Sequence, residues 1–275
     1  MKKKKNILFI VSLIVLILAI GGMVTYFAIR AKQAKEYEDI AALARNTTET
    51  TTAQATTPAA TAATETTTEE TTPEETTKPK PDIPIDFEAL WEINPDIYAW
   101  LTIPGTSIDY PILHSSEDDP DYYLDHTVYH DVGLPASIYT QSNHNKDLGK
   151  DNLTVIYGHR MLDKTMFGPF EKFWDEEFRQ EHNLIIIYTP EHIYTYLLAF
   201  AVTFDDRNLL YTYDDCRDPE TYAMFRSDIQ NERLLPSWIH YEFPDVTDQR
   251  MIVMSTCNGI DDQRILVGGV LIDEQ

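Results

Sequence analysis

The chain has 275 residues, with 22 basic and 45 acidic side chains, and a formal net charge of −23. The first 81 residues hold ten basic and nine acidic side chains, so residues 82–275 hold the other 12 and 36, a net charge of −24. A surface of that sign repels phosphate, which argues against nucleic-acid binding. Two cysteines in the whole chain exclude a disulfide-built scaffold.

Residues 1–35 have the pattern of a membrane signal anchor. Lys2–Lys5 is a basic cluster, and the 23 residues Ile7–Ile29 that follow carry no charge. A helix of that length measures about 35 Å, enough to cross a hydrocarbon core of roughly 30 Å. A cleaved signal peptide is the alternative, but its apolar region usually has about 7–15 residues. The denser basic cluster on the N-terminal side predicts a cytoplasmic N-terminus, with the residues after the anchor outside the cell.

Residues 36–81 are predicted to form a disordered stalk. The stretch Thr47–Thr77 contains 16 Thr, 6 Ala and 6 Glu, without aromatic or large aliphatic side chains. Such a segment has no apolar surface whose burial would offset the entropy of ordering it. The alternating lysines and prolines of Lys78–Pro81 favour an extended spacer. We expect this stalk to hold the domain that follows away from the membrane.

Residues 82–275 have the apolar content of one folded domain, in which strand patterns dominate. Two short helices are expected at its start, one over Asp86–Ile93 with Asp86 as its cap and one over Pro95–Leu101. Runs of β-branched and aromatic residues predict strands at Ala136–Thr140, Leu153–Tyr157, Leu184–Tyr188, Ile193–Thr203, Arg250–Ser255 and Ile265–Ile272. Helices are expected at about 167–173, 175–181 and 219–230. The pattern predicts a mainly β fold, a barrel or a sandwich with helical insertions.

The segment Met251–Cys257 has the pattern of a nucleophile at the end of a strand. An apolar strand ends at the cysteine, and the turn-like Asn258-Gly259 follows. The strand fixes the backbone while the loop leaves the sulfur accessible, and a nearby cation favours the reactive thiolate. Arg264 opens the next strand, and a short loop between antiparallel strands brings it beside Cys257. Its guanidinium is suited to stabilising an oxyanion there.

The cysteines also permit other interpretations. A free cysteine is most often a buried, inert thiol, and the position of Cys257 fits that description as well. Cys216 lies in the acidic run Asp214–Asp218, where like charges raise the pKa of a thiol and make it less reactive. A Cys216–Cys257 disulfide is a further alternative for a domain outside the cell.

The segment Leu153–His159 places a second titratable group at the end of a strand. Histidine titrates near neutral pH and can transfer protons between a nucleophile and a leaving amine. A single histidine at such a position is also a common structural residue. The other histidines lie in polar loops or at helix ends and form no metal-binding spacing such as His-Glu-x-x-His; they are His114, His126, His130, His144, His182, His192 and His240. The histidines therefore predict no metal site, and no residue pattern indicates a cofactor. Acidic pairs such as Asp118-Asp119 and Asp205-Asp206 fit calcium binding and solvated loops equally well.

Four blocks follow one another along the chain: Asp86–Leu101, Ile103–Ile112, Val155–Met161 with Thr165–Gly168, and Ser255–Cys257 with Arg264. Together and in this order they resemble the sortases, the membrane-anchored cysteine transpeptidases of Gram-positive surfaces, and class B in particular. The resemblance covers about residues 85–272 and implies a sortase-like β-barrel with an N-terminal helical pair and helical insertions. In this family the insert before the cysteine strand, here about 204–250, helps to select the substrate.

The resemblance implies catalytic roles for His159, Cys257 and Arg264. Cys257 would attack the carbonyl of a threonine in a C-terminal sorting signal to form a thioester, and His159 would protonate the departing amine. Arg264 would stabilise the oxyanion or orient the substrate, and Ser255 and Thr256 would line the groove. The acyl group would then pass to an amine of a peptidoglycan precursor or a pilin lysine. The implied partners are surface or pilin proteins that carry a sorting signal.

Three departures from the family pattern concern the groove. The loop Asn258–Gln263 is short, Arg160 follows the histidine where asparagine is common, and Ala136–Gln141 replaces a segment that ends in aspartate. Two other functions also fit these residues. One is a cell-wall cysteine hydrolase that uses water as the acceptor, and the other is a catalytically silent, wall-facing binding protein.

Overall fold

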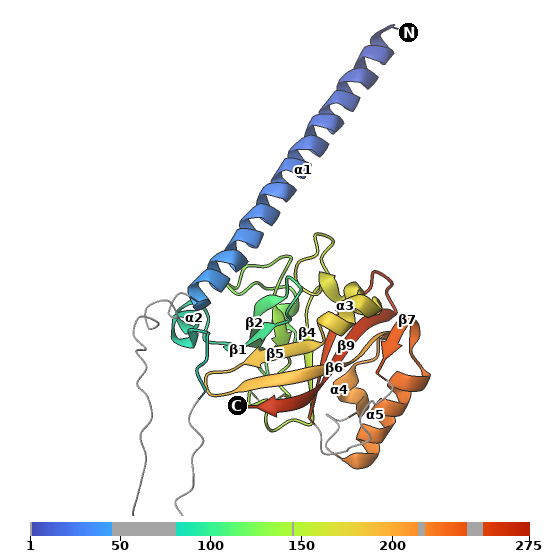
Figure 1. Cartoon of the computed structure of the whole chain (residues 1–275). Helices are drawn as coiled ribbons and strands as arrows, with labels where there is room; N and C mark the ends of the chain where they lie inside the picture. The colour runs from blue at the N-terminus through green and yellow to red at the C-terminus, as the bar shows by residue number, and fades with distance from the viewer. Residues whose placement is uncertain (1, 46–80, 145, 214–217, 241–249) are drawn as a thin grey trace, which may run out of the picture.

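The strands form a closed barrel. The computed structural model describes residues 2–45, 81–144, 146–213, 218–240 and 250–275. Its strands are β1 (Ile97–Thr102), β2 (Asp109–His114), β3 (Ile138–Thr140), β4 (Leu153–Tyr157), β5 (Leu184–Tyr188), β6 (Ile193–Asp205), β7 (Leu234–Ile239), β8 (Met251–Cys257) and β9 (Gln263–Glu274). They follow the order β5-β1-β2-β3-β4-β8-β9-β6-β7, and a further pairing of β5 with β6 closes the sheet (Figure 1). The predicted mainly β fold is confirmed, and it is a barrel.

Helices surround this barrel, and aspartate side chains cap the N-termini of several of them. The helices are α1 (Lys2–Arg45), α2 (Phe87–Ile93), η2 (Tyr122–Leu124), η3 (Gly168–Trp174), α3 (Glu176–Glu181), α4 (Leu209–Tyr213) and α5 (Pro219–Asn231). Asp86 caps α2 by accepting a hydrogen bond from the Ala89 amide at 3.0 Å, as the sequence predicts. Asp218 caps α5 in the same way. The predicted helical insertions are therefore present, with α5 inside the insert that precedes β8.

One predicted helix is wrong. Pro95–Leu101 was expected to be the second member of an N-terminal helical pair, but Ile97–Thr102 is β1. The pattern misled because Ile97–Leu101 is buried at every position. A strand covered on both faces shows no alternation, and a short apolar run of that kind does not distinguish a strand from a helix. Strand β7 was also not predicted.

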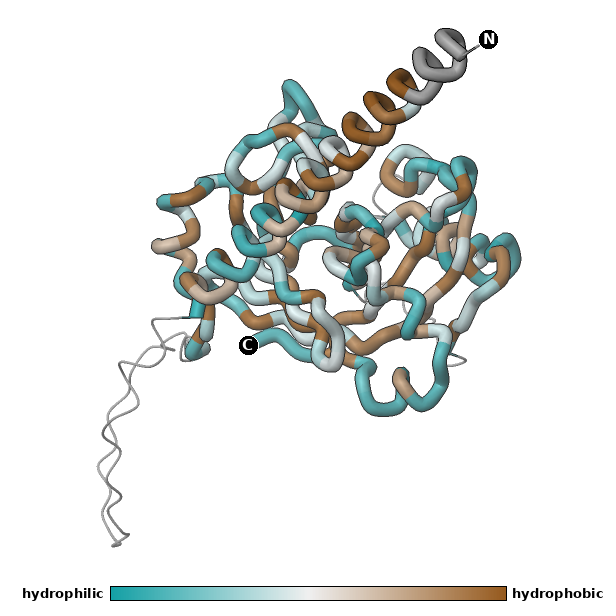
Figure 2. The backbone as a smooth tube through the Cα atoms, turned by 90° about the horizontal axis from the view of Figure 1, so that it is seen from above, coloured by the Kyte–Doolittle hydropathy of each residue, from teal (hydrophilic) through white to brown (hydrophobic). Residues whose placement is uncertain are grey.

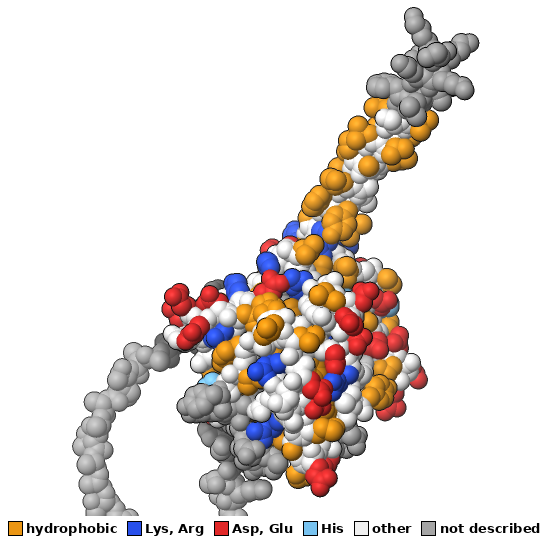
Figure 3. Space-filling model, turned by 90° about the vertical axis from the view of Figure 1, so that its right-hand side faces the viewer, with side chains coloured by type: hydrophobic (Ala, Val, Ile, Leu, Met, Phe, Trp, Pro, Cys, Tyr) orange, Lys and Arg blue, Asp and Glu red, His pale blue; other side chains and the backbone are white. Residues whose placement is uncertain are grey.

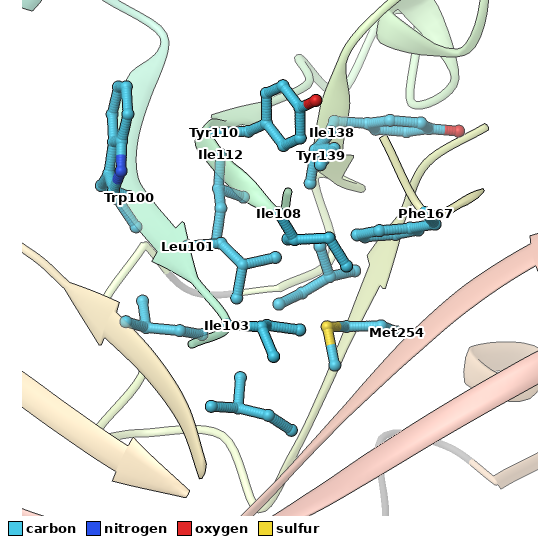
Figure 4. Packing of buried hydrophobic residues seen from close by; sticks show 14 of the residues in the cluster. Trp100, Leu101, Ile103, Ile108, Tyr110, Ile112, Ile138, Tyr139, Phe167 and Met254 are labelled. Carbon is cyan, nitrogen blue, oxygen red and sulfur yellow. The ribbon is translucent and has the colours of Figure 1, made fainter. Parts of the chain in front are cut away.

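Two clusters of buried side chains hold β8 from both sides. Inside the barrel, Ile252 and Met254 belong to the cluster that Figure 4 shows around Leu101 and Ile103. On the other face, Met251 and Val253 pack in a second cluster under α4 and α5. Burial of each such side chain stabilises the fold by about 1.5–3 kcal/mol. The strand that ends at Cys257 is thus fixed along its length. Figure 2 shows the same pattern for the whole domain, with apolar strands inside and polar loops around them.

Helix α1 continues beyond the apolar segment and packs on the domain. Its N-terminal part is long and apolar enough to cross a membrane, and Figure 3 shows apolar side chains around the part that projects from the domain. Residues 36–45, which the sequence assigns to the stalk, are helical. The Asp86 amide donates to the Ala44 carbonyl at 2.8 Å, so the end of α1 lies against the start of the domain. The domain thus contacts α1 directly, whereas a spacer was expected; residues 46–80 of the predicted stalk lie outside the described residues.

Candidate active site

The parallel pairing of β4 with β8 brings His159 and Cys257 to one edge of the barrel. Tyr157 lies opposite Ser255 in the register of these strands, and the Gly158 amide donates to the Ser255 carbonyl at 3.2 Å. His159 and Cys257 each follow this pair by two residues. Because parallel strands run in the same direction, equal offsets beyond one register pair place two side chains side by side.

The ring of His159 is oriented by backbone groups. Its Nε2 atom lies 2.6 Å from the Leu124 carbonyl oxygen. A carbonyl only accepts, so Nε2 carries a hydrogen and Nδ1 is the nitrogen left to exchange a proton. The His159 carbonyl accepts from the Phe167 amide at 2.9 Å, which closes the loop that follows. A hydrogen bond with Cys257 and the Leu124 carbonyl raise the pKa of His159, although burial works in the opposite direction.

Cys257 is an exposed, free thiol. The hydrogen bond with His159 lowers the pKa of Cys257, and partial burial opposes this effect. The backbone amide of Arg160 and the charge of Arg264 lower the pKa of Cys257 further. These groups favour the thiolate, which is the nucleophilic form of cysteine. Cys257 is therefore not buried, in contrast to the alternative of a buried structural thiol. Cys216 lies outside the described residues.

Arg264 lies beside Cys257, as the short loop between the strands predicts. The two residues face each other directly in the antiparallel pair β8–β9. The Nη1 atom of Arg264 donates to the carbonyls of Asp261 and Gln263 at 3.0 and 2.8 Å. A guanidinium has five N–H donors, and these two bonds involve Nη1 alone. The loop therefore fixes the arginine, and among the described residues Nε and Nη2 have no other partner, so they can donate to a bound group.

Ser255 and Thr256 differ in their relation to Cys257. Both are buried and both border the cavity in front of the cysteine. Side chains alternate along a strand, so Ser255 lies on the same face as Cys257 and Thr256 lies on the other. The hydroxyl of Thr256 is buried, with no hydrogen-bond partner among the described residues. Ser255 is thus the better placed of the two to contact a substrate.

A cavity of about 510 Å³ connects these side chains. Residues that the sequence did not single out supply much of its wall; they are Asp121, Leu124, Tyr139, Tyr157 and Arg207. Asp121 accepts hydrogen bonds from the Tyr139 hydroxyl at 3.0 Å and from Gln141 at 2.7 Å. The sequence did not distinguish Asp121 from the neighbouring acidic residues. Its role depends on the fold, which places Asp121 opposite Tyr139 and Gln141. The departure at Gln141 thus leaves a carboxylate in the groove, supplied by a different segment.

A sequence model of the sortase domain family matches residues 101–272. The chain belongs to the sortase family. It is 30% identical over 193 residues to sortase B of Listeria monocytogenes, covering 68% of this chain and 74% of that protein. It is 28% identical over 174 residues to sortase B of Staphylococcus aureus, covering 62% and 67% of the two chains.

Solved class B sortases share the fold of this sortase. Sortase B of Clostridium perfringens superposes with a TM-score of 0.59 at 25% identity, over 68% of this chain and 100% of that chain. The S. aureus sortase B–substrate complex superposes with a TM-score of 0.57 at 25% identity, over 68% and 84% of the two chains. The protein is therefore a cysteine transpeptidase of the class B type.

Arg160, which departs from the sortase pattern, ties the histidine segment to the cysteine loop. Its guanidinium forms an ion pair with Glu171 and donates to the Asn258 carbonyl at 3.3 Å. Its backbone amide faces Cys257. Because its guanidinium is engaged by Glu171 and Asn258, Arg160 is not placed as a second cation for the oxyanion. It holds together the two loops that carry His159 and Cys257 in this sortase.

Proposed function

We propose that this sortase is anchored in the membrane and cleaves a C-terminal sorting signal after threonine. It then transfers the acyl group to an amine of a peptidoglycan precursor or of a pilin lysine. The observation that carries the proposal is the convergence of Cys257, His159 and Arg264 on one cavity. Solved relatives support the substrate classes, since one sortase B has been determined with a substrate and another with triglycine. A Streptococcus pyogenes class B sortase is involved in pilus biogenesis.

In the acylation step, the thiolate of Cys257 attacks the threonine carbonyl carbon and forms a tetrahedral intermediate. Nδ1 of His159 donates its proton to the amide nitrogen of the scissile bond, and the carbon–nitrogen bond breaks. The C-terminal fragment leaves as a free amine, and the N-terminal fragment stays on Cys257 as a thioester. The reciprocal pKa shifts of the pair favour the thiolate and the imidazolium that this step uses.

In the transfer step, the acceptor amine loses a proton to Nδ1 of His159 and attacks the thioester carbonyl. The carbon–sulfur bond breaks, Cys257 leaves as a thiolate, and a new amide bond is formed. The histidine is protonated again at the end of the cycle, so the site is ready for the next substrate. Water in place of the amine would give hydrolysis with the same residues.

Arg264 acts on the developing negative charge. Arg264 faces Cys257 in the β8–β9 register and borders the same cavity, where the carbonyl oxygen of a bound substrate becomes an oxyanion. A preorganised donor at this position commonly contributes about 100- to 1,000-fold to the rate. Ser255, on the same face of β8 as Cys257, is proposed to contact the substrate backbone, with a smaller contribution from Thr256.

We propose that residues 1–35 form the anchor, with the N-terminus in the cytoplasm and the catalytic domain of residues 82–275 outside the cell. The basic cluster before the apolar segment supports this orientation. The length and composition of α1 support a single membrane crossing. The remainder of the predicted stalk of residues 36–81, which follows Arg45, would then connect α1 to the catalytic domain.

A transfer assay tests the proposal. The protein is incubated with a library of threonine-containing sorting peptides and an amine acceptor, and the products are identified by mass spectrometry. We expect peptide–amine products that depend on Cys257 and His159. Hydrolysed peptide as the main product at saturating amine would favour the hydrolase. Absence of both products across the library, with an unreactive Cys257, would favour the silent binding protein.

A further inference from the structure

The end of α1 is part of the folded domain. Tyr37, Ile40 and Ala44 are at most 9% exposed and belong to the same buried cluster as the barrel interior. These positions recur at intervals of three and four residues, so they form one face of the helix. Large apolar side chains between Ile10 and Ile29, by contrast, are 45–69% exposed. Figure 1 shows the N-terminal part of α1 projecting away from the domain, and the C-terminal end of the helix lying against it.

A carboxylate on the barrel, whose position is fixed by neighbouring side chains, binds Arg45, the last residue of α1. Arg45 donates through two nitrogen atoms to the carboxylate of Asp109. That carboxylate also accepts from the Trp100 indole and the Thr102 hydroxyl, each at 2.8 Å. The backbone bond between Ala44 and Asp86 lies next to this ion pair. These contacts fix the position of the C-terminal end of α1 on the domain.

The same helix reaches the loop that follows His159. Arg30 forms an ion pair with Asp163, at the tip of that loop. Asp163 organises the tip by accepting from the Thr165 amide and hydroxyl at 3.1 and 2.6 Å. The base of the loop is closed by the bond from the Phe167 amide to the His159 carbonyl. The ion pair with α1 at the tip therefore helps to fix the loop whose base is bonded to the His159 backbone.

A second path leads from α1 to the ring of His159. The hydroxyl of Tyr37 donates to the carbonyl of Ala136. The next residue, Ser137, donates from its amide to Tyr123 at 3.3 Å and from its hydroxyl to His126 at 2.9 Å. Those two carbonyls lie on either side of Leu124, the residue whose carbonyl accepts from Nε2 of His159. The segment that Tyr37 holds is thus bonded to the segment that orients the histidine.

We propose that residues 30–45 of α1 position His159, so that docking of this helix is required for full activity. The same helix holds the loop after His159 directly, through Arg30 and Asp163. It holds the carbonyl that fixes the ring of His159 through the segment of Ala136 and Ser137. A displacement of a catalytic group by about 1 Å can lower a rate about 100-fold. The proposal rests on the proposed function only for its kinetic consequence, because the state of the Cys257–His159 pair is measurable without a substrate.

The test uses the full chain in detergent micelles, with Tyr37→Ala as the main variant. The matched control is Leu43→Ala, because Leu43 lies on the exposed side of the same part of the helix. We expect Tyr37→Ala to lower kcat about 10- to 100-fold with little change in KM. We also expect the midpoint of Cys257 alkylation by iodoacetamide to move to higher pH, since a displaced His159 stabilises the thiolate less. The control should retain the parent values of both.

Two milder variants keep the test decisive if Tyr37→Ala unfolds. Tyr37→Phe removes the bond to Ala136 and keeps the ring, and Asp163→Asn removes the charge that pairs with Arg30. Each should give a smaller shift of the alkylation midpoint in the same direction, with unchanged thermal unfolding. Unchanged alkylation profiles in folded variants would overturn the proposal. A parent chain with no transfer activity would instead contradict the proposed function, and the alkylation comparison would still decide the role of α1.

Discussion

His159 and Cys257 occupy equivalent positions at the ends of two parallel strands, each two residues beyond the register pair Tyr157–Ser255. Neither residue is near the other in the chain, and the pairing of β4 with β8 alone brings them together. The same edge of the barrel receives Arg264 from the antiparallel neighbour β9. The chemistry proposed for this sortase therefore depends on the register of three adjacent strands.

Replacement of His159 tests the reciprocal pKa shifts. His159→Gln removes the group that raises the thiolate fraction, so alkylation of Cys257 should require a higher pH than in the parent. Transfer activity should fall at least about 100-fold, because the general acid is lost as well. His192→Gln is the control, since His192 contacts Glu274 away from the cavity. An alkylation profile that His159→Gln leaves unchanged would contradict the proposed pair.

Gly158 should be indispensable for the position of His159. A Cβ atom there would lie 2.8 Å from the ring of Phe167, which is fully buried, and 3.2 Å from Ile138. Gly158→Ala must displace the Phe167 ring, and Phe167 closes the loop after His159. We expect a loss of transfer activity of about 10-fold or more, larger than the loss of stability explains.

The control for this variant is Gly268→Ala, whose Cβ atom would lie still closer to an aromatic ring, 2.3 Å from Phe200, away from the cavity. Both variants should unfold at lower temperature than the parent, by an amount typical of overpacking, about 1–3 kcal/mol. At a temperature where both are folded, only Gly158→Ala should show the loss of kcat. Equal activities in the two variants would show that the clash affects stability alone.

The sequence predicted the chemistry of the site better than its geometry. Cys257 with Arg264 was within reach, because a strand, a short loop and a second strand bring their ends together. The partnership of His159 with Cys257 rested on family resemblance, since parallel strands joined by a long connection leave no local signal. The role of Leu124 could not be predicted from the sequence either, for a different reason. It acts through its backbone carbonyl, which any residue provides.

The fold was predictable where the pattern was local. Leu153–Tyr157 and Leu184–Tyr188 were predicted with the bounds that β4 and β5 have. The helix expected over Pro95–Leu101 failed because β1 is buried on both faces. The composition of the predicted stalk gave no indication that its first residues, 36–45, continue α1 and pack on the barrel.

Acid should weaken the attachment of α1 through Asp109. Burial raises the pKa of Asp109, but the bonds from Arg45, Trp100 and Thr102 outweigh it and lower the pKa below its ordinary value. A carboxyl with a lowered pKa contributes stability above its unfolded pKa of about 3.9, and this stability is lost as the pH falls through the folded value. Asp109→Asn should cost about 1 kcal/mol or less at pH 7, since Arg45 is partly exposed. The difference in thermal unfolding between parent and variant should shrink as the pH falls below the unfolded pKa and vanish once the folded-state carboxyl of Asp109 is protonated. A difference that stays constant through acid pH would exclude the ionic contribution.

The acidic domain should favour basic substrates. Residues 82–275 carry a net charge of −24, and Asp121, Asp206 and Asp261 border the cavity. Sorting peptides with lysine-rich flanks should react faster than neutral ones at low salt, and the advantage should shrink as the ionic strength rises toward about 0.5 M. The comparison uses kcat/KM at several salt concentrations. A ratio that is independent of salt would show that the charge does not steer the substrate.

The most direct test of Cys257 as the nucleophile is the mass of the intact protein after mixing with the sorting-peptide library in the absence of an amine. We expect an adduct equal to the N-terminal acyl fragment, located on Cys257, sensitive to hydroxylamine, and discharged when an amine is added. Cys257→Ala, with an unchanged circular dichroism spectrum, should form no adduct. Cleavage of peptides by Cys257→Ala at the rate of the parent, or an adduct on a different residue, would contradict the assignment of Cys257 as the nucleophile.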